Sequence, residues 1–75
     1  MTDTNIRNEI NHIQVRLFRL AWKEWGISED RCADLFDMYN IDEYIADQYD
    51  LFHIQGDEAN LDEISSFLRS RGEQI

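Results

Sequence analysis

The sequence predicts an all-α protein, a compact four-helix domain with a long N-terminal helix and three shorter helices. Apolar residues recur at spacings of three and four along most of the chain, as they do in amphipathic helices. The 75 residues include no proline and only three glycines, so few positions interrupt a helix. This length suits a single domain, with its core expected at about residues 5–72, and the 43% hydrophobic content favours a folded chain over a disordered one.

The first helix is expected from about Ile6 to Trp25. Thr4 or Asn5 can cap its start, and Gly26 can adopt the left-handed conformation that often follows a helix. One apolar stripe contains Ile6, Ile10, Ile13, Leu17, Leu20 and Ala21. A second stripe beside it contains Val15, Phe18, Trp22 and Trp25, and the polar remainder contains His12, Arg16, Arg19 and Lys23. The two stripes together are wider than the usual apolar stripe of about 100°.

The second stripe allows two interpretations. Its residues can form an exposed patch for a partner or for a second copy of the chain, because aromatic anchors dominate the energetics of interfaces. Alternatively, the first helix is central and the other helices cover both stripes. We favour the covered arrangement, although complete burial of both tryptophans is difficult in so small a domain. The basic residues of the first helix are expected to face solvent or to pair with acidic residues of the second and third helices.

The second and third helices follow Gly26. The second is expected to begin after the N-cap Ser28 and to end near Asn40. The third is expected to be capped by Asp42 and to end within residues 49–56, whose sequence is YDLFHIQG. Their inward-facing residues are Cys32, Leu35, Phe36 and Tyr39 on the second helix and Ile41, Tyr44, Ile45 and Tyr49 on the third.

The fourth helix is expected from about Leu61 to Arg71. Asn60, followed three residues later by Glu63, resembles a capping box, and Gly72 can close the helix. Its inward-facing residues are Leu61, Ile64, Phe67 and Leu68.

The charge of the chain is strongly acidic and uneven. The net charge is −9, and residues 28–63 contain twelve acidic side chains and one basic side chain, Arg31. Direct binding of nucleic acid is not expected there, because affinity for phosphates comes mainly from lysine and arginine. A protein partner with a basic surface is the natural complement, and simple solubility is the alternative explanation. The candidate partner-binding residues are Asp34, Asp37, Glu43, Asp47, Asp50, Phe18, Trp22 and Trp25.

No pattern in the sequence predicts an enzyme, a cofactor or a metal site. Tyr49, Asp50 and His53 lie close together, but a nucleophile–base set also needs a nucleophile. Cys32 is the only cysteine and falls on the predicted core face, where a thiol is usually inert. The chain has no Gly-rich phosphate loop and no metal-ligand spacing. Since it also has no signal-peptide pattern and no membrane-spanning apolar run, we expect a cytoplasmic protein.

From the second helix onward the chain resembles a family of short bacterial proteins, domain of unknown function 3791. The segments LFDMYNIDEYIADQYDLFHIQG and LDEISSFLRSRG carry the resemblance, which extends over about residues 8–72. The matching positions are Leu35, Phe36, Tyr39, Tyr49, Asp50, His53, Gln55, Gly56, Arg71 and Gly72. The family has no established activity, but its genes can lie beside those of ADP-ribosyltransferase-like toxins, which implies an antitoxin or accessory role.

Together these observations lead to a functional hypothesis and to an interpretation of YDLFHIQG. We expect a small acidic protein-binding module, an antitoxin-like inhibitor or accessory protein. The alternatives are a DNA-mimic inhibitor of a nucleic-acid enzyme, of the phage anti-defence type, and a purely structural homodimer. Tyr49, His53 and Gly56 are interpreted as structural anchors, in which the imidazole of His53 bonds a free carbonyl and joins the third helix to the turn at Gly56.

Overall fold

Five α-helices make up the part of the chain that the structure describes. The structure is a computed structural model that describes residues 2–75, with side chains from residue 4 onward. The helices are α1 (Thr2–Trp25), α2 (Glu29–Met38), α3 (Ile41–Asp47), α4 (Tyr49–Phe52) and α5 (Asp57–Ser70), with no strand among these residues. The prediction of an all-α domain with a long N-terminal helix is therefore confirmed, with a single turn, α4, added to the four longer helices.

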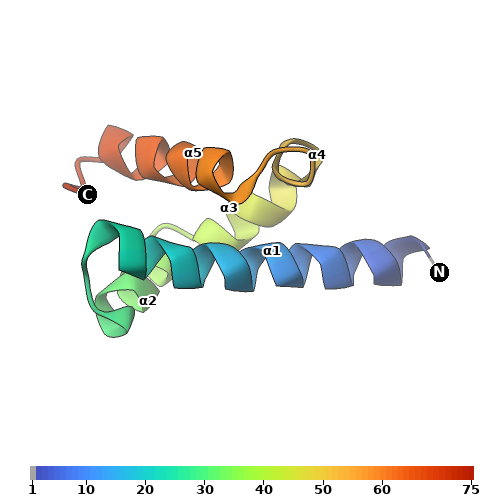
Figure 1. Cartoon of the computed structure of the whole chain (residues 1–75), viewed down its shortest axis with the longest axis horizontal. Coiled ribbons are helices and arrows are strands. Elements are labelled where there is room, and N and C mark those ends of the chain that lie inside the picture. Colours follow the sequence, from blue (N-terminus) through green and yellow to red (C-terminus); the bar gives the residue numbers. More distant parts are fainter. Residues whose placement is uncertain (1) are drawn as a thin grey trace.

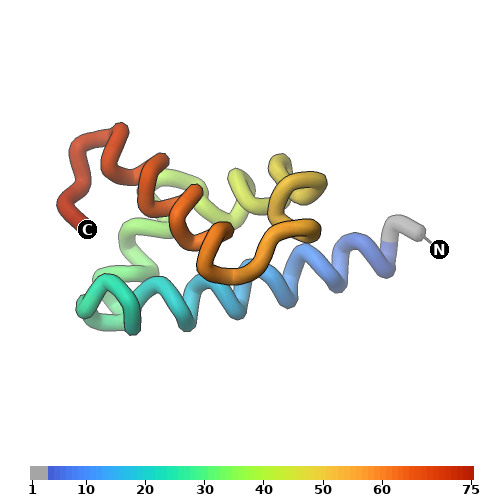
Figure 2. Tube along the Cα trace, turned by 45° about the horizontal axis from the view of Figure 1, so that its top comes forward, coloured from blue at the N-terminus to red at the C-terminus, as the bar shows by residue number. Residues whose placement is uncertain are grey.

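The helix α1 sets the length of the molecule. Its 24 residues correspond to about 36 Å of helix, close to the longest dimension of 39 Å. The other helices pack along it, and the N-terminal end of α1 extends beyond them (Figures 1 and 2). The C-terminus lies near the opposite end of the molecule (Figure 1).

Several helix ends follow the signals in the sequence. The hydroxyl of Ser28 accepts a hydrogen bond of 3.0 Å from the backbone N–H of Arg31, as expected of an N-cap. Gly26 and Gly72 have φ values of 66° and 96°, in the region that glycine tolerates best. Asn40 also has a positive φ, 51°, which ends α2 because asparagine tolerates the left-handed conformation.

Three other boundaries differ from the predictions. The first helix begins at Thr2 rather than near Ile6. The N-cap of α3 is Asn40, so Asp42 lies in the first turn instead of capping the helix. The predicted third helix breaks at Gln48, whose φ and ψ of −101° and 26° separate α3 from α4.

The last helix differs most from its prediction. It begins at Asp57, after Gly56, and not at Leu61. Asn60 is therefore not a cap but a buried residue inside α5, 1% exposed. The chain also packs onto the domain beyond residue 72, since Ile75 contacts the core and Glu73 accepts hydrogen bonds from Tyr39 and Arg31.

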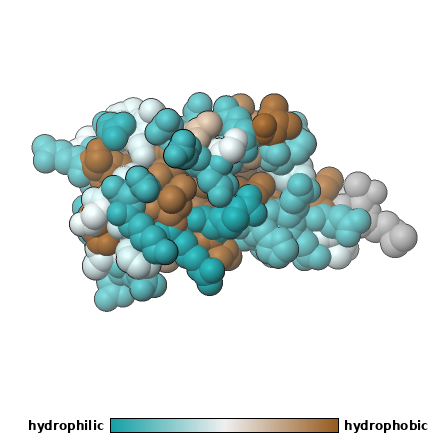
Figure 3. Space-filling view, viewed as in Figure 1, coloured by the Kyte–Doolittle hydropathy of each residue, from teal (hydrophilic) through white to brown (hydrophobic). Residues whose placement is uncertain are grey.

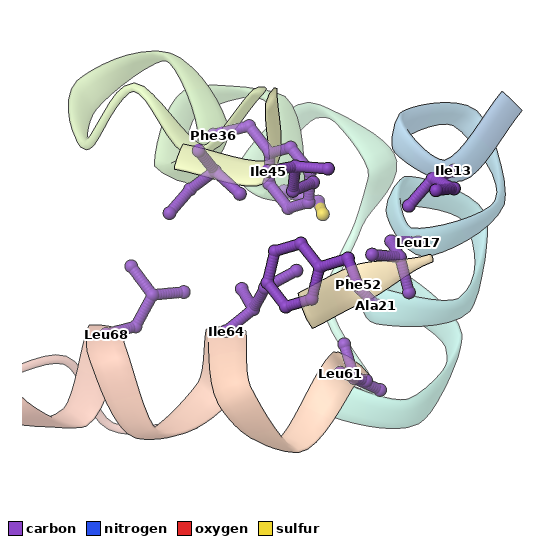
Figure 4. Close-up of a cluster of buried hydrophobic side chains, with 11 residues drawn as sticks. Ile13, Leu17, Ala21, Phe36, Ile45, Phe52, Leu61, Ile64 and Leu68 are labelled. Atoms are coloured by element: carbon purple, nitrogen blue, oxygen red, sulfur yellow. The ribbon is translucent and has the colours of Figure 1, made fainter. Parts of the chain in front are cut away.

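One hydrophobic core joins all five helices. Figure 4 shows Phe52 in the middle of this core, with α5 along one side, Phe36 and Ile45 opposite α5, and α1 closing the end. Burial of each large aliphatic or aromatic side chain contributes about 1.5–3 kcal/mol. The core residues are Ile13, Leu17, Ala21, Cys32, Phe36, Ile41, Ile45, Phe52, Leu61, Ile64 and Leu68.

Candidate functional site

The acidic residues predicted to bind a partner lie at exposed positions on α2, α3 and α4, and we call them together the acidic surface. Cys32, Leu35 and Phe36 are buried on one side of α2, so the acidic side chains on its other side are exposed. The five carboxylates predicted to bind a partner are all exposed: Asp34, Asp37, Glu43, Asp47 and Asp50. Figure 3 shows one face of the molecule, on which hydrophilic side chains separate smaller hydrophobic patches.

None of these five carboxylates forms an ion pair with a cation among residues 4–75. Among residues 4–75, the ion pairs are Arg16–Asp57, at 3.5 Å, and Arg31–Glu73, at 3.2 Å. The residues of the basic stripe are exposed, as one of the two expectations had it, and the ion pair that Arg16 forms is with α5 rather than with the second or third helix. The charges of the five carboxylates remain available to an approaching molecule within about 8 Å, the screening length at physiological ionic strength.

A groove with a volume of about 620 Å³ lies between α1, α2 and α3. We call it the α1–α2–α3 groove. Its apolar surface comes from Val15, Phe18, Ala33 and Phe36. Its charged surface comes from Glu29, Asp37, Asp42 and Glu43, with Arg19 as the basic residue of the lining. We call the apolar residues of this lining its floor and the charged residues, which are mainly acidic, its rim.

Contacts between the helices shape this groove. The rings of Phe18 and Phe36 pack edge to face with centroids 5.2 Å apart, which holds α1 against α2. The amide Nε2 of Gln14 donates a hydrogen bond of 2.8 Å to the backbone carbonyl of Asp42, which connects α1 to α3. Desolvation raises the pKa of the Asp42 carboxyl above its ordinary value.

The sequence predicted only part of this groove. Phe18, Asp37 and Glu43 were among the candidate partner-binding residues, and all three line it. Val15 belongs to the second apolar stripe predicted from the sequence. It is 49% exposed, which fits a position at the edge of that wide stripe. Ala33 has no signal in the sequence, because a small residue on a polar helix face is common.

The two tryptophans lie outside the groove lining. Both are half-buried and pack against the core, as does Phe18. The indole N–H of Trp25 donates a hydrogen bond of 3.0 Å to the hydroxyl of Ser65 on α5. The indole nitrogen of Trp22 is buried without a hydrogen-bond partner among the described residues, and the ammonium of Lys23 lies 5.7 Å from its ring centroid. The two tryptophans of the second stripe are thus partly covered by other helices, whereas Phe18 also lines the groove.

The segment YDLFHIQG contains α4, which contacts α1 through Tyr49. The hydroxyl of Tyr49 donates a hydrogen bond to the carboxylate of Glu9 on α1, and this bond raises the pKa of the phenol. The imidazole of His53 is exposed and stacks on the Tyr49 ring with centroids 4.7 Å apart. Tyr49 therefore anchors α4 to α1, and His53 packs on the outer side of that anchor.

The carbonyl bond predicted for His53 is made by another residue. The side-chain Nδ2 of Asn60 donates a buried hydrogen bond of 2.8 Å to the backbone carbonyl of Phe52, at the end of α4. Asn60 thus joins this helix end to α5, and the interpretation of His53 as the carbonyl partner is corrected. Gly56 is the N-cap of α5 with a φ of −75°, a conformation open to most residues.

The thiol of Cys32 is the remaining reactive group that the sequence analysis considered. Cys32 is fully buried, and burial raises the pKa of its thiol to about 11, so the thiolate is disfavoured. Among the described residues, no group of three or more His, Cys, Asp or Glu side chains is arranged to hold a metal ion. No helix within residues 2–75 combines the length and the apolar character needed to cross a membrane.

The comparison with protein families identifies the family of the chain. The family model described as "Protein of unknown function (DUF3791)" matches residues 14–71. The chain belongs to this family. The matched residues include every residue that lines the α1–α2–α3 groove except Asn11, and the whole of YDLFHIQG. No curated protein and no solved structure matches the chain.

Proposed function

We propose that this member of the family is a cytoplasmic, non-enzymatic module that binds a protein with a basic surface and acts as an antitoxin-like inhibitor or accessory protein. The observation that supports the proposal is the set of exposed carboxylates on α2, α3 and α4, none of which forms an ion pair within the described residues. Such a surface attracts a cationic protein and speeds its association.

The arrangement of these carboxylates argues for binding over mere solubility. Asp34 and Asp37 are three residues apart on α2, and Glu43 and Asp47 are four residues apart on α3. Like charges at these spacings destabilise a helix by about 0.2–0.5 kcal/mol per pair. A cationic partner would relieve this repulsion, which acidic residues that serve solubility alone have no reason to create.

The proposal is tested by the salt dependence and charge dependence of partner binding. The tagged protein and a variant in which Asp34, Asp37, Glu43 and Asp47 are changed to lysine are used to capture proteins from cells of the source organism. A partner retained by the wild type is then purified and its affinity measured at low and high salt. We expect steep weakening with salt and slower association with the variant.

The same measurement separates the proposal from its alternatives. Competition by double-stranded DNA for the purified partner would identify a DNA-mimic inhibitor of a nucleic-acid enzyme. Capture of no protein other than a second copy of the chain, or binding that neither salt nor the four substitutions weaken, would contradict binding through the acidic surface.

A further inference from the structure

The α1–α2–α3 groove has the dimensions of a site for a short helix. Along α1 its lining runs from Asn11 to Arg19, which corresponds to about 12 Å of helix axis. The apolar anchors of an amphipathic helix at positions i, i+3 or i+4, and i+7 extend over about 10.5 Å. Three such anchors therefore fit within the length of the groove.

The all-helical surroundings of the groove favour a helix over an extended peptide as its occupant. The described residues contain no strand, so there is no sheet edge with which the backbone of an extended peptide could pair. A helix satisfies its own backbone hydrogen bonds, and its side chains can pack between the ridges of two neighbouring helices. Val15, Ala33 and the ring of Phe18 offer an accessible apolar floor for such packing.

The mainly acidic charge of the rim indicates that the polar residues of the bound helix are basic. Glu29, Asp37, Asp42 and Glu43 contribute four carboxylates, against one guanidinium from Arg19. None of these groups forms an ion pair among residues 4–75. A helix with lysine or arginine on both sides of its apolar stripe would place cations beside these carboxylates.

We infer that the α1–α2–α3 groove binds a short amphipathic helix of the partner protein, with an apolar stripe flanked by lysine or arginine. This inference rests on the proposed function, because it names the part of the basic partner that is recognised. The apolar stripe lies against Val15, Phe18 and Ala33, and the basic residues meet the rim. The carboxylates outside the groove, such as Asp34 and Asp47, steer the partner without contacting its apolar stripe.

The test uses two synthetic peptides of 18 residues composed of leucine and lysine. One has its leucines at helical spacing on one face, and the other has the same composition in a scrambled order. Binding to the full chain is measured by calorimetry, with circular dichroism to verify that each protein variant is folded. We expect the amphipathic peptide to bind at least tenfold more tightly than the scrambled peptide.

Matched variants locate the binding site. Val15→Ser changes an exposed apolar residue of the groove, and Met38→Ser changes an exposed apolar residue, 61% exposed, outside its lining. We expect only the first to weaken binding of the amphipathic peptide, by about fivefold. The double reversal Asp37→Lys with Glu43→Lys should weaken it by about tenfold, and the same change of charge at Asp34 and Asp47 by less than threefold.

The outcomes distinguish this inference from the proposed function. Equal binding of the two peptides, with equal losses from the two double reversals, would show attraction by charge alone; the groove would then be the wrong site while the proposed function stands. Binding of neither peptide would overturn the helix inference, and the partner capture would decide the proposed function separately. Self-association of the wild type that Val15→Ser abolishes would assign the groove to a second copy of the chain and also overturn the inference.

Discussion

The hydrogen bond from Asn60 to the Phe52 carbonyl should be one of the most costly polar contacts to remove. Asn60 is 1% exposed, and its Nδ2 lies 2.8 Å from the carbonyl oxygen at the end of α4. Asn60→Ala leaves this carbonyl buried without a donor, which costs about 1–3 kcal/mol. The Oδ1 atom of Asn60 is itself buried without a hydrogen-bond partner among the described residues, so its removal offsets part of the loss. We expect a net destabilisation of about 2 kcal/mol.

Thermal unfolding followed by circular dichroism measures this effect. For a domain of this size, 2 kcal/mol lowers the melting temperature by about 10 °C. Asn60→Leu keeps most of the volume but lacks the donor, so it should also be destabilised. His53→Ala serves as the control, because an exposed ring stacked on Tyr49 should contribute less than about 1 kcal/mol. The assignment is wrong if both Asn60 variants melt like the wild type while His53→Ala loses 10 °C.

Three further predictions concern Ser65, Cys32 and Glu73. Ser65→Ala removes the acceptor of the Trp25 indole N–H and should cost about 1 kcal/mol in denaturant unfolding followed by tryptophan fluorescence; an unchanged midpoint would contradict it. Burial raises the pKa of the Cys32 thiol from 9.0 to about 11, so stability should fall as the pH rises from 9 towards 11, because the unfolded chain loses this proton first. A thiol reagent should accordingly modify Cys32 only after unfolding, and rapid modification of the native protein would refute this. The hydrogen bond to Glu73 raises the pKa of the Tyr39 phenol, so Glu73→Gln should lower that pKa. Ultraviolet titration measures the change, and an unaltered pKa of Tyr39 would contradict the bond.

The helices and the acidic character of the protein could be predicted from the sequence because both depend on local patterns. Apolar spacing marks one face of a helix wherever that face packs. Ser28 caps a backbone N–H three residues away, and Asn40 and Gly72 themselves adopt the positive φ that follows the end of a helix. The family resemblance was also visible in the sequence, and the match over residues 14–71 confirms it. The exposed position of Asp34 and Asp47 follows from the same helical periodicity.

The role of Asn60 depends on contacts that the sequence does not display. Asparagine before an apolar run is a common N-cap, and the local pattern therefore predicted a helix start at Leu61. In the structure the buried side chain of Asn60 donates a hydrogen bond to the backbone carbonyl of Phe52, eight positions earlier, and α5 begins at Asp57. A buried polar atom must find a partner, and which partner it finds is decided by tertiary packing.

The sequence by itself thus determined that this protein is helical and acidic and where most of its helices end, because these properties depend on residues within about two helical turns of each other. Only the tertiary structure decided that α1, α2 and α3 meet around a groove, because Val15 and Ala33 lie on different helices and become neighbours only after packing. It also decided which acidic residues surround that groove. Asp37 and Glu43 line it, whereas Asp34 and Asp47, alike in sequence character, do not, because the packing angle of the helices selects one part of each polar face.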